Sequence, residues 1–150
     1  MYFVRSKSLA AVDQVAVVQV LQKAAPNAYI DAGRPAYAPI IRSEMVLFLA
    51  RTQVDRFAWR NAQPKSDTPE MVCASFSLLL WGLIEQQRLA EHVAAPFAAC
   101  RVRFLRHSSC GFLSQDGLFL LIEPQNDQIM TVDGYRFDHP GEEIQHITLL

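Results

Sequence analysis

Apolar and polar positions follow two different periods in two parts of the chain. From about residue 68 to residue 94, apolar side chains recur with helical spacing, and their face includes Val72, Phe76, Leu79, Leu80, Leu83 and Ile84. Beyond Pro96, short alternating runs are separated by Gly and Pro turns. Because the two periods occupy separate stretches, they predict an α+β domain, with the long helix packed on a curved antiparallel sheet.

The long helix has a clear predicted start. Asn61 to Asp67 resembles a linker, and Thr68-Pro69-Glu70 follows it. A Thr cap, a Pro in the first turn and an early acid all favour a helix N-terminus. A second, N-terminal helix is expected from Ser6 or Ser8 to about Ala24, beside the long helix, after a short strand at Tyr2 to Arg5.

The stretch between the two helices is harder to interpret. Residues 28 to 39 hold Gly33, Pro35 and Pro39, which favour an irregular connection or an edge segment. Residues 44–60 have a strand-like composition and predict a bent strand or a hairpin. A helix remains the alternative there, because Met, Leu and Ala are good helix formers.

Two Asp-Gly pairs shape the predicted meander. Asp116-Gly117 and Asp133-Gly134 are each flanked by apolar or aromatic residues, which is typical of two-residue hairpins. Pro140-Gly141 then turns the chain into a last strand, from Glu143 to Leu149. We therefore expect four strands in this half and a positive φ at Gly134.

Composition and charge narrow the function classes. The 150 residues are the size of one domain, 51% are hydrophobic, and fourteen basic residues nearly cancel fifteen acidic ones. This balance disfavours nucleic acid as a partner, and the surplus of apolar residues predicts a homodimer. The apolar core from Met71 to Ile84 is too short to span a bilayer, and no clean signal peptide precedes it, so we expect a cytoplasmic protein that does not bind membranes.

The three cysteines predict neither a disulfide framework nor a zinc site, because their number is odd and no CxxC spacing occurs. Cys73 is expected to be buried and inert. A thiolate at Cys110 activated by His107 is disfavoured, because residues 107 and 110 of one strand point to opposite faces unless a bulge intervenes. No metal and no cofactor is predicted.

A cationic strip is the first candidate binding site. Arg101, Arg103 and His107 alternate along a predicted strand, so they share one face and can bind a carboxylate or a phosphate. The alternative is a solvated strand face whose charge is balanced by Glu123 or Asp138. A second candidate surface surrounds Trp59, because aromatic residues beside arginines such as Arg56 and Arg60 are enriched at binding hot spots.

A third group mixes imidazoles and carboxylates near the C-terminal end: Asp138, His139, Glu142, Glu143 and His146. These residue types can form an acid–base pair or a metal site, but the sequence sets no distance between them, and a polar turn is the commoner outcome.

The order of helix, uncertain strand region, helix and four-strand meander resembles that of the cone-shaped nuclear transport factor 2-like domains. The resemblance implies a pocket between helix and sheet, a tendency to dimerise, and either ligand binding or simple acid–base catalysis. It transfers no role to any residue, because no motif supports it.

Two functions remain. The favoured hypothesis is a non-enzymatic binding or interaction module that uses an apolar pocket or an exposed sheet face for an apolar ligand, an anionic ligand or a protein. The alternative is a small cofactor-independent enzyme with a His/carboxylate pair in a pocket between helix and sheet. The enzyme would be favoured if His107, His139 or His146 points into a cavity and has a carboxylate within hydrogen-bond reach.

Overall fold

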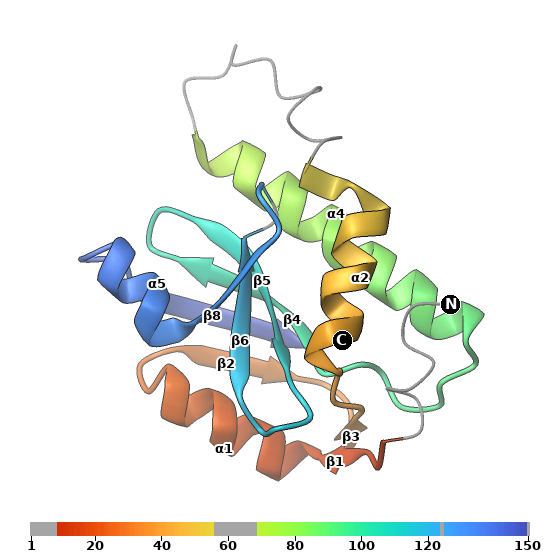
Figure 1. Cartoon of the computed structure of the whole chain (residues 1–150). Helices are drawn as coiled ribbons and strands as arrows, with labels where there is room; N and C mark the ends of the chain where they lie inside the picture. Colours follow the sequence, from red (N-terminus) through yellow and green to blue (C-terminus); the bar gives the residue numbers. More distant parts are fainter. Residues whose placement is uncertain (1–8, 56–68, 124, 150) are drawn as a thin grey trace.

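The computed structural model describes residues 9–55, 69–123 and 125–149, and within this part of the chain a six-stranded sheet has helices on both faces (Figure 1). The strands of this sheet are β2 (Tyr29–Ala32), β4 (Ala99–Phe104), β5 (Ser108–Leu113), β6 (Phe119–Glu123), β7 (Gln128–Thr131) and β8 (Ile144–Leu149). A small second sheet pairs β1 (Val12–Asp13) with β3 (Ala36–Tyr37).

The large sheet has the order β2-β8-β4-β5-β6-β7. All its neighbouring strands are antiparallel except β2 and β8, which pair in parallel with Tyr29 opposite His146. The sheet is therefore mixed. The α+β class is confirmed, and the expectation of a wholly antiparallel sheet is corrected at its β2 edge.

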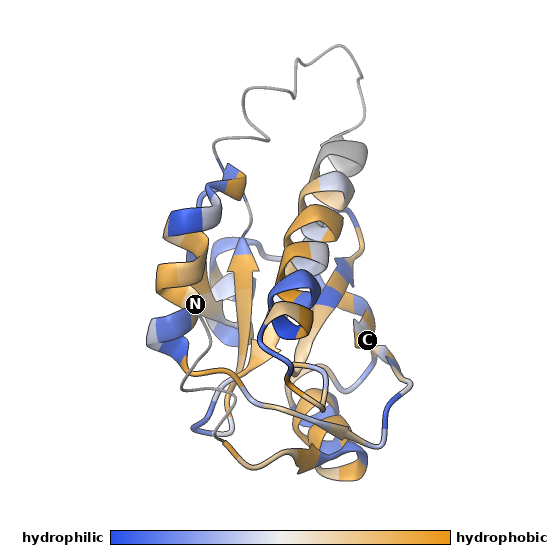
Figure 2. Cartoon of the chain, turned by 90° about the vertical axis from the view of Figure 1, so that its right-hand side faces the viewer, coloured by the Kyte–Doolittle hydropathy of each residue, from blue (hydrophilic) through white to orange (hydrophobic). Residues whose placement is uncertain are grey.

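One face of the sheet is covered by α2 (Arg42–Thr52) and α4 (Pro69–Ala90). Phe48 of α2 and Leu80 of α4 join Phe112 and Ile122 of the sheet in one buried cluster. Figure 2 shows α4 as mostly hydrophobic along its middle and hydrophilic in its last turns. This helix confirms the main sequence prediction, although its last residue is four positions before the expected end.

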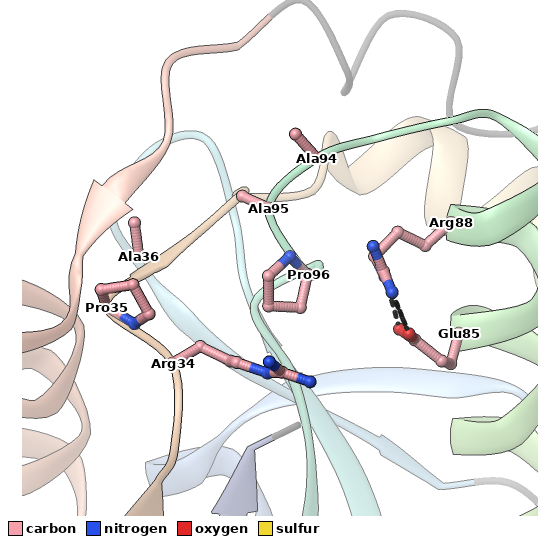
Figure 3. Close-up of a pocket in the computed structure, with 8 residues that line it drawn as sticks. All are labelled: Arg34, Pro35, Ala36, Glu85, Arg88, Ala94, Ala95 and Pro96. Atoms are coloured by element: carbon pink, nitrogen blue, oxygen red, sulfur yellow. Dashed lines mark hydrogen bonds and ion pairs between the residues drawn. The ribbon is translucent and has the colours of Figure 1, made fainter.

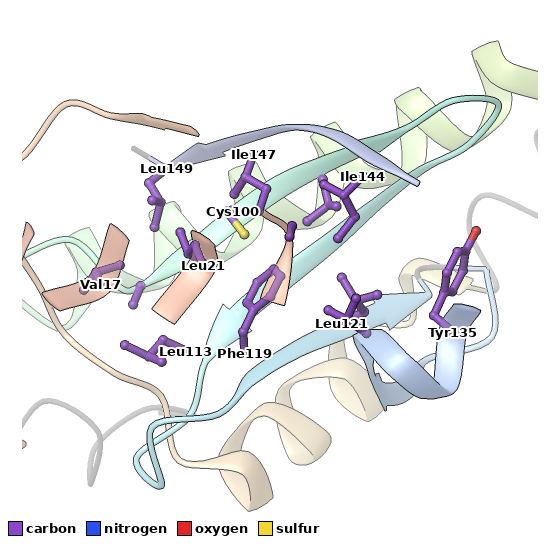
Figure 4. Packing of buried hydrophobic residues seen from close by; sticks show 14 of the residues in the cluster. Val17, Leu21, Cys100, Leu113, Phe119, Leu121, Tyr135, Ile144, Ile147 and Leu149 are labelled. Carbon is purple, nitrogen blue, oxygen red and sulfur yellow. The ribbon is translucent and has the colours of Figure 1, made fainter. Parts of the chain in front are cut away.

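The other face is covered by α1 (Gln14–Ala24) and α5 (Val132–Asp138). One buried cluster on this face contains Val17 and Leu21 of α1, Leu121 and Ile147 of the sheet, and Tyr135 of α5 at its other end (Figure 4). The N-terminal helix thus lies across the sheet from α4 and not beside it. Its cap is Asp13, whose carboxylate accepts from the Ala16 amide, so α1 begins later than Ser6 or Ser8.

Two predicted strand regions are helical. Arg42–Thr52 forms α2, with Glu44 in the first turn and Arg51 in the last, so the helical alternative for residues 44–60 is the correct one over the described residues. Asp133-Gly134 lies in the first turn of α5, where Thr131 caps the Gly134 amide, so the predicted hairpin with positive φ at Gly134 is wrong.

The other turn prediction holds in part. Gly117 has a φ of +76° between β5 and β6, which confirms a hairpin there. Its loop is five residues long, because Leu113 and Phe119 form the last pair. The expected strand at Tyr2 to Arg5 lies outside the described residues. Among the residues that are described, no helix is long and apolar enough to cross a membrane.

Candidate functional site

Three side chains meet at the end of the sheet near the beginning of α4. Nε2 of His107 lies 2.6 Å from a carboxylate oxygen of Glu123, and the imidazole also hydrogen-bonds the Cys73 thiol. The His107 and Glu123 side chains are 18% and 15% exposed, and Cys73 is 7% exposed. The group is therefore largely shielded from water and contains a nucleophile, a base and a carboxylate.

The backbone explains why His107 and Glu123 meet. Leu105 and Arg106 form the tip of the β4–β5 hairpin, which closes with a 2.8 Å bond from the Phe104 amide to the His107 carbonyl oxygen. Across the next pair of strands, Cys110 lies opposite Ile122. Continuing this register by one residue brings Glu123 opposite Ser109, on the same face as His107 and diagonal to it.

The imidazole lies beside two aromatic rings, Phe104 and Tyr135, which stack on each other with centroids 4.3 Å apart. The ring of His107 is nearly parallel to that of Tyr135, with centroids 6.2 Å apart and 12° between the planes, and Phe104 lies 6.1 Å from it. Burial is also the largest influence that raises the pKa of the Tyr135 phenol, so this ring stays neutral. The packing restricts the orientation of the imidazole between Cys73 and Glu123.

Opposing influences set the protonation of His107. Desolvation is the largest single one and lowers its pKa, but hydrogen bonds to Cys73 and Glu123, together with the charges of both groups, outweigh it and raise the pKa from 6.5 to about 10. The imidazole is therefore cationic at neutral pH. An imidazolium beside a thiol favours the thiolate, the nucleophilic form of cysteine.

Cys73 lies at the fifth position of α4, just past the first turn. Because the field of a helix dipole is concentrated in that first turn, it acts only weakly at Cys73. The side-chain amide of Gln125 donates to Sγ of Cys73 at 3.2 Å. A neutral amide donor thus lies beside the sulfur.

The other two thiols have different surroundings. Cys110 is 1% exposed, its Sγ donates to the Ser77 carbonyl oxygen at 3.1 Å, and burial raises its pKa well above the usual range. Burial likewise raises the pKa of Cys100. His107 and Cys110 also pack on opposite faces of the sheet, as the alternation predicted. Cys110 has no activating base, and of the three thiols Cys73 alone meets the imidazole.

The predicted cationic strip is divided by the structure. Arg101 and Arg103 line a cavity of about 220 Å³ between α4 and the sheet, together with His146, Ser77, Ser108, Val102 and Thr148. His107 is not among these lining residues. The predicted surface at Trp59 and Arg56 lies outside the described residues, and so does Arg60.

The acidic and imidazole group near the C-terminal end is dispersed. His139 stacks on Tyr135 with a centroid distance of 4.3 Å, whereas His146 lies edge-on to Tyr29 at 4.9 Å. In the described ranges, no three His, Cys, Asp or Glu side chains are arranged so that they could hold a metal ion.

A larger cavity, of about 390 Å³, lies at the far end of α4 from Cys73 (Figure 3). Its polar side chains are Arg34, Glu85 and Arg88, and the last two pair with each other through bonds of 2.8 Å from Nε of Arg88. This pairing satisfies Glu85 and Arg88, and the described residues that line the cavity include no nucleophile.

No family model matches the chain, and neither does any curated protein. Solved structures do match. One is described as "PSL1a-E64 complex" and another as Polyporus squamosus lectin bound to the epitope Neu5Aca2-6Galb1-4GlcNAc. Both have a TM-score of 0.67, with 11% and 10% sequence identity, and 93% of this chain is covered.

These likenesses are to the fold. The chain spans about half the length of the two matched proteins, 50% and 49% of their chains. At such low identity the similarity establishes the arrangement of helices and strands, and the function must be argued from this chain's own side chains.

Each of the three clustered residues has a sequence-based prediction, but no pattern joins them. Cys73 is predicted to be buried and inert, His107 to belong to the cationic strip, and Glu123 to balance the charge of that strip. One usable signal was the spacing of His107 and Glu123 about the Asp116-Gly117 turn, which a hairpin brings together. The approach of Cys73 depends on how α4 crosses the sheet, and no sequence spacing specifies that.

Proposed function

We propose that the protein is a cysteine-dependent hydrolase of amide or ester bonds, with Cys73 as nucleophile, His107 as acid and base, and Glu123 as the group that orients the imidazole. The observation that carries the proposal is the contact of His107 with both Cys73 and a carboxylate 2.6 Å away. Nucleophile, base and orienting group in this order define the triads of serine and cysteine hydrolases, including the Cys-His-Asn triad of papain-like proteases.

The first chemical step forms a thioester. The Cys73 thiolate attacks the substrate carbonyl carbon, the carbonyl π electrons move to oxygen, and Gln125 lies where its amide can donate to that oxygen. When the tetrahedral species collapses, the bond to the leaving nitrogen or oxygen breaks. The imidazolium of His107 gives its proton to that leaving group, so amine or alcohol departs and the acyl group stays on sulfur.

The second step regenerates the enzyme. Water attacks the thioester carbon while neutral His107 accepts a proton from that water. The carbon–sulfur bond then breaks, the carboxylic acid leaves, and the thiolate–imidazolium pair is restored. Glu123 keeps Nε2 of His107 engaged throughout, so the other ring nitrogen, Nδ1, is the one that faces sulfur and substrate.

The test is acyl-enzyme formation with p-nitrophenyl acetate. Wild type should release a burst of p-nitrophenol equivalent to the enzyme present, and mass spectrometry should place the acetyl group on Cys73. Cys73→Ala should show no burst, whereas the matched variant Cys110→Ala, which removes a thiol without a base, should keep it. A burst that survives Cys73→Ala would contradict the proposal. E64, the compound in one matched structure, is a second reagent to test on the same three proteins.

A second candidate function is the non-enzymatic binding module, and one observation favours it: a matched structure is a lectin in complex with a sialylated epitope. On this proposal the chain would bind a carbohydrate without cleaving it. Titration with that trisaccharide, followed by calorimetry on wild type and Cys73→Ala, tests it. Saturable binding together with no burst on p-nitrophenyl acetate would favour this candidate.

The homodimer also remains a prediction. Apolar side chains more than half exposed on α2 and α4, namely Val46, Leu47, Leu78 and Leu89, support it. Light scattering at micromolar concentration should give twice the mass of 16.9 kDa, and the monomer mass would contradict it. A cytoplasmic location remains a sequence-based prediction.

A further inference from the structure

The cavity between α4 and the sheet contains a two-row array of polar side chains. In one row, Arg103 lies opposite Ser108 of β5 and His146 of β8. In the next row, Arg101 lies opposite Cys110 of β5 and Thr148 of β8. Because opposed residues of paired strands share a face, the backbone register itself directs both arginines and His146 to the α4 side.

Two side-chain nitrogen atoms of residues that line this cavity are unsatisfied. Nε of Arg101 and Nε2 of His146 are buried and have no hydrogen-bond partner among the described residues. A buried polar atom without a partner costs free energy comparable to a lost hydrogen bond, so an unpaired guanidinium nitrogen in a cavity indicates a missing acceptor. Both atoms belong to residues that line the same space of about 220 Å³. This is room for a side chain rather than for a single water molecule.

The charges around the cavity favour an anion. Two arginines line it, and none of the lining residues that the structure describes is acidic. Cys110, which shares the row of Arg101, is held in its neutral form by burial. The nearest carboxylate by register is Asp31 of β2, which lies opposite Thr148, one strand further from Arg101, and is exposed. An exposed carboxylate at that distance is well solvated and screens the guanidinium only weakly.

The cavity adjoins the cysteine site on the α4 side of the sheet. Ser77, which lines it, follows Cys73 by one turn of α4, and residues four apart in a helix lie on one face. Ser108, which also lines it, directly follows His107, although the imidazole itself lies on the opposite face, beside Tyr135. A substrate held with its carbonyl at Cys73 therefore has this cavity within reach of its neighbouring groups.

We propose that this cationic cavity binds the side-chain carboxylate of an acidic residue in a peptide substrate, close to the bond that Cys73 attacks. That the anion belongs to a peptide substrate rests on the proposed hydrolase function. That the cavity binds an anion at all rests on the cavity alone. Arg101 is the main determinant, since its planar guanidinium can bond a carboxylate through two nitrogens, and Arg103 adds charge at the exposed rim.

The binding experiment uses Cys73→Ala, which cannot turn substrate over, and two ligands that differ by one charge. N-acetyl-glutamate methylamide should perturb the NMR signals of Arg101 and His146 and bind about tenfold more tightly than N-acetyl-glutamine methylamide at low salt. Arg101→Gln and Arg103→Ala should reduce this difference, and Arg103→Ala should keep its melting temperature because Arg103 is exposed. Arg42→Gln, which replaces an exposed arginine on α2, is the matched control. It should change neither the difference in affinity between the two ligands nor the melting temperature. Equal affinity of both ligands would overturn the proposal.

Titration with other anions tests whether the cavity binds a peptide carboxylate or a different anion. Inorganic phosphate and free Neu5Ac are titrated into the same proteins. If either binds through Arg101 while the glutamate ligand does not, the peptide assignment is overturned.

Turnover separates this proposal from the hydrolase proposal. Peptides in which a single Glu or Gln scans the positions around one scissile bond should show a Glu preference of about tenfold in kcat/KM at one position, which is lost in Arg101→Gln and kept in Arg42→Gln. Cleavage through Cys73 without any Glu preference would overturn the acidic substrate and leave the hydrolase. Glutamate binding through Arg101 without cleavage of any peptide would overturn the hydrolase and, with it, the substrate role, and would leave an anion site.

Discussion

Two thiols on the α4 side of the sheet differ in what surrounds them. Cys110, in the middle of β5, donates to a backbone carbonyl beneath the helix and stays neutral, within a cluster that includes Phe112 and Leu80. Cys73, near the start of α4, contacts an imidazolium and a side-chain amide at the end of the sheet. The comparison separates two influences: burial keeps Cys110 neutral, whereas a cationic imidazole lies beside the sulfur of Cys73, as the proposed function requires.

The largest expected effect is a loss of stability from a substitution in the buried cluster around Cys110. Phe112 is completely buried between α4 and the sheet, so Phe112→Ala should lower the free energy of unfolding by about 4 kcal/mol through lost burial and a residual cavity. Cys73→Ala, at the proposed catalytic site, should lower it by less than about 1 kcal/mol. Urea denaturation of the two variants measures both, and equal losses would mean that Cys73 serves packing as much as Phe112 does.

The next largest effect is expected on the alkylation rate of Cys73 when the imidazole of His107 is removed. His107→Gln should slow alkylation of Cys73 by iodoacetamide at pH 6 by about 100-fold, because on the proposed mechanism the imidazolium favours the nucleophilic thiolate and glutamine carries no charge. His139→Gln is the control, since that imidazole stacks on Tyr135 without a described contact to sulfur. Rates followed by mass spectrometry that are the same in both variants would show that His107 does not activate the thiol.

A smaller effect concerns pH and stability. The folded-state pKa of His107 is raised from 6.5 to about 10, so its contribution to stability is fully present below pH 6.5 and is lost as the pH rises through 10. Wild type should therefore lose stability between pH 7 and pH 10 more steeply than His107→Gln does. Glu123→Gln, which removes a charge that raises this pKa, should show an intermediate slope. Parallel curves for all three proteins, measured by urea denaturation, would contradict the assigned protonation.

The smallest effect lies at Gly134. In a hairpin with positive φ, any side chain at this position would be strained, but the residue lies in the first turn of α5. An added Cβ would meet Oγ1 of Thr131 at 3.2 Å, a tight contact that offsets the helix propensity gained by alanine. Gly134→Ala should change the free energy of unfolding by less than about 1 kcal/mol in either direction. A loss much larger than this, measured by urea denaturation, would favour the strained turn.

The elements with strong local signals were predictable from the sequence. The α4 helix has a cap-like start, a wide apolar face and a Pro beyond its end, and Gly117 supplies the positive φ that its turn requires. At Asp133-Gly134 the same dipeptide begins a helix, because Thr131 caps it and Tyr135 packs into the core. Tertiary burial overrides a turn signal in that position.

The candidate site was less predictable for a physical reason. Arg101 and Arg103 share a strand, so alternation alone placed them on one face, and the cavity confirms that they lie together. The partnership of Cys73 with His107 joins residues from a helix and a hairpin, and only the packing of α4 on the sheet brings them into contact. His146 likewise joins Arg103 through the β4–β8 pairing, which spans a long stretch of sequence.

The most direct test of the central claim is the pH profile of alkylation at each cysteine of the native protein. Iodoacetamide is added from pH 5 to pH 9, and peptide mapping by mass spectrometry gives a separate rate for Cys73, Cys100 and Cys110. The account predicts that Cys73 reacts at pH 6 with a rate that changes little up to pH 8, and that Cys100 and Cys110 react only after unfolding. A Cys73 rate that rises about tenfold per pH unit toward pH 8.5, as for an ordinary thiol, or no reaction at all, would contradict it.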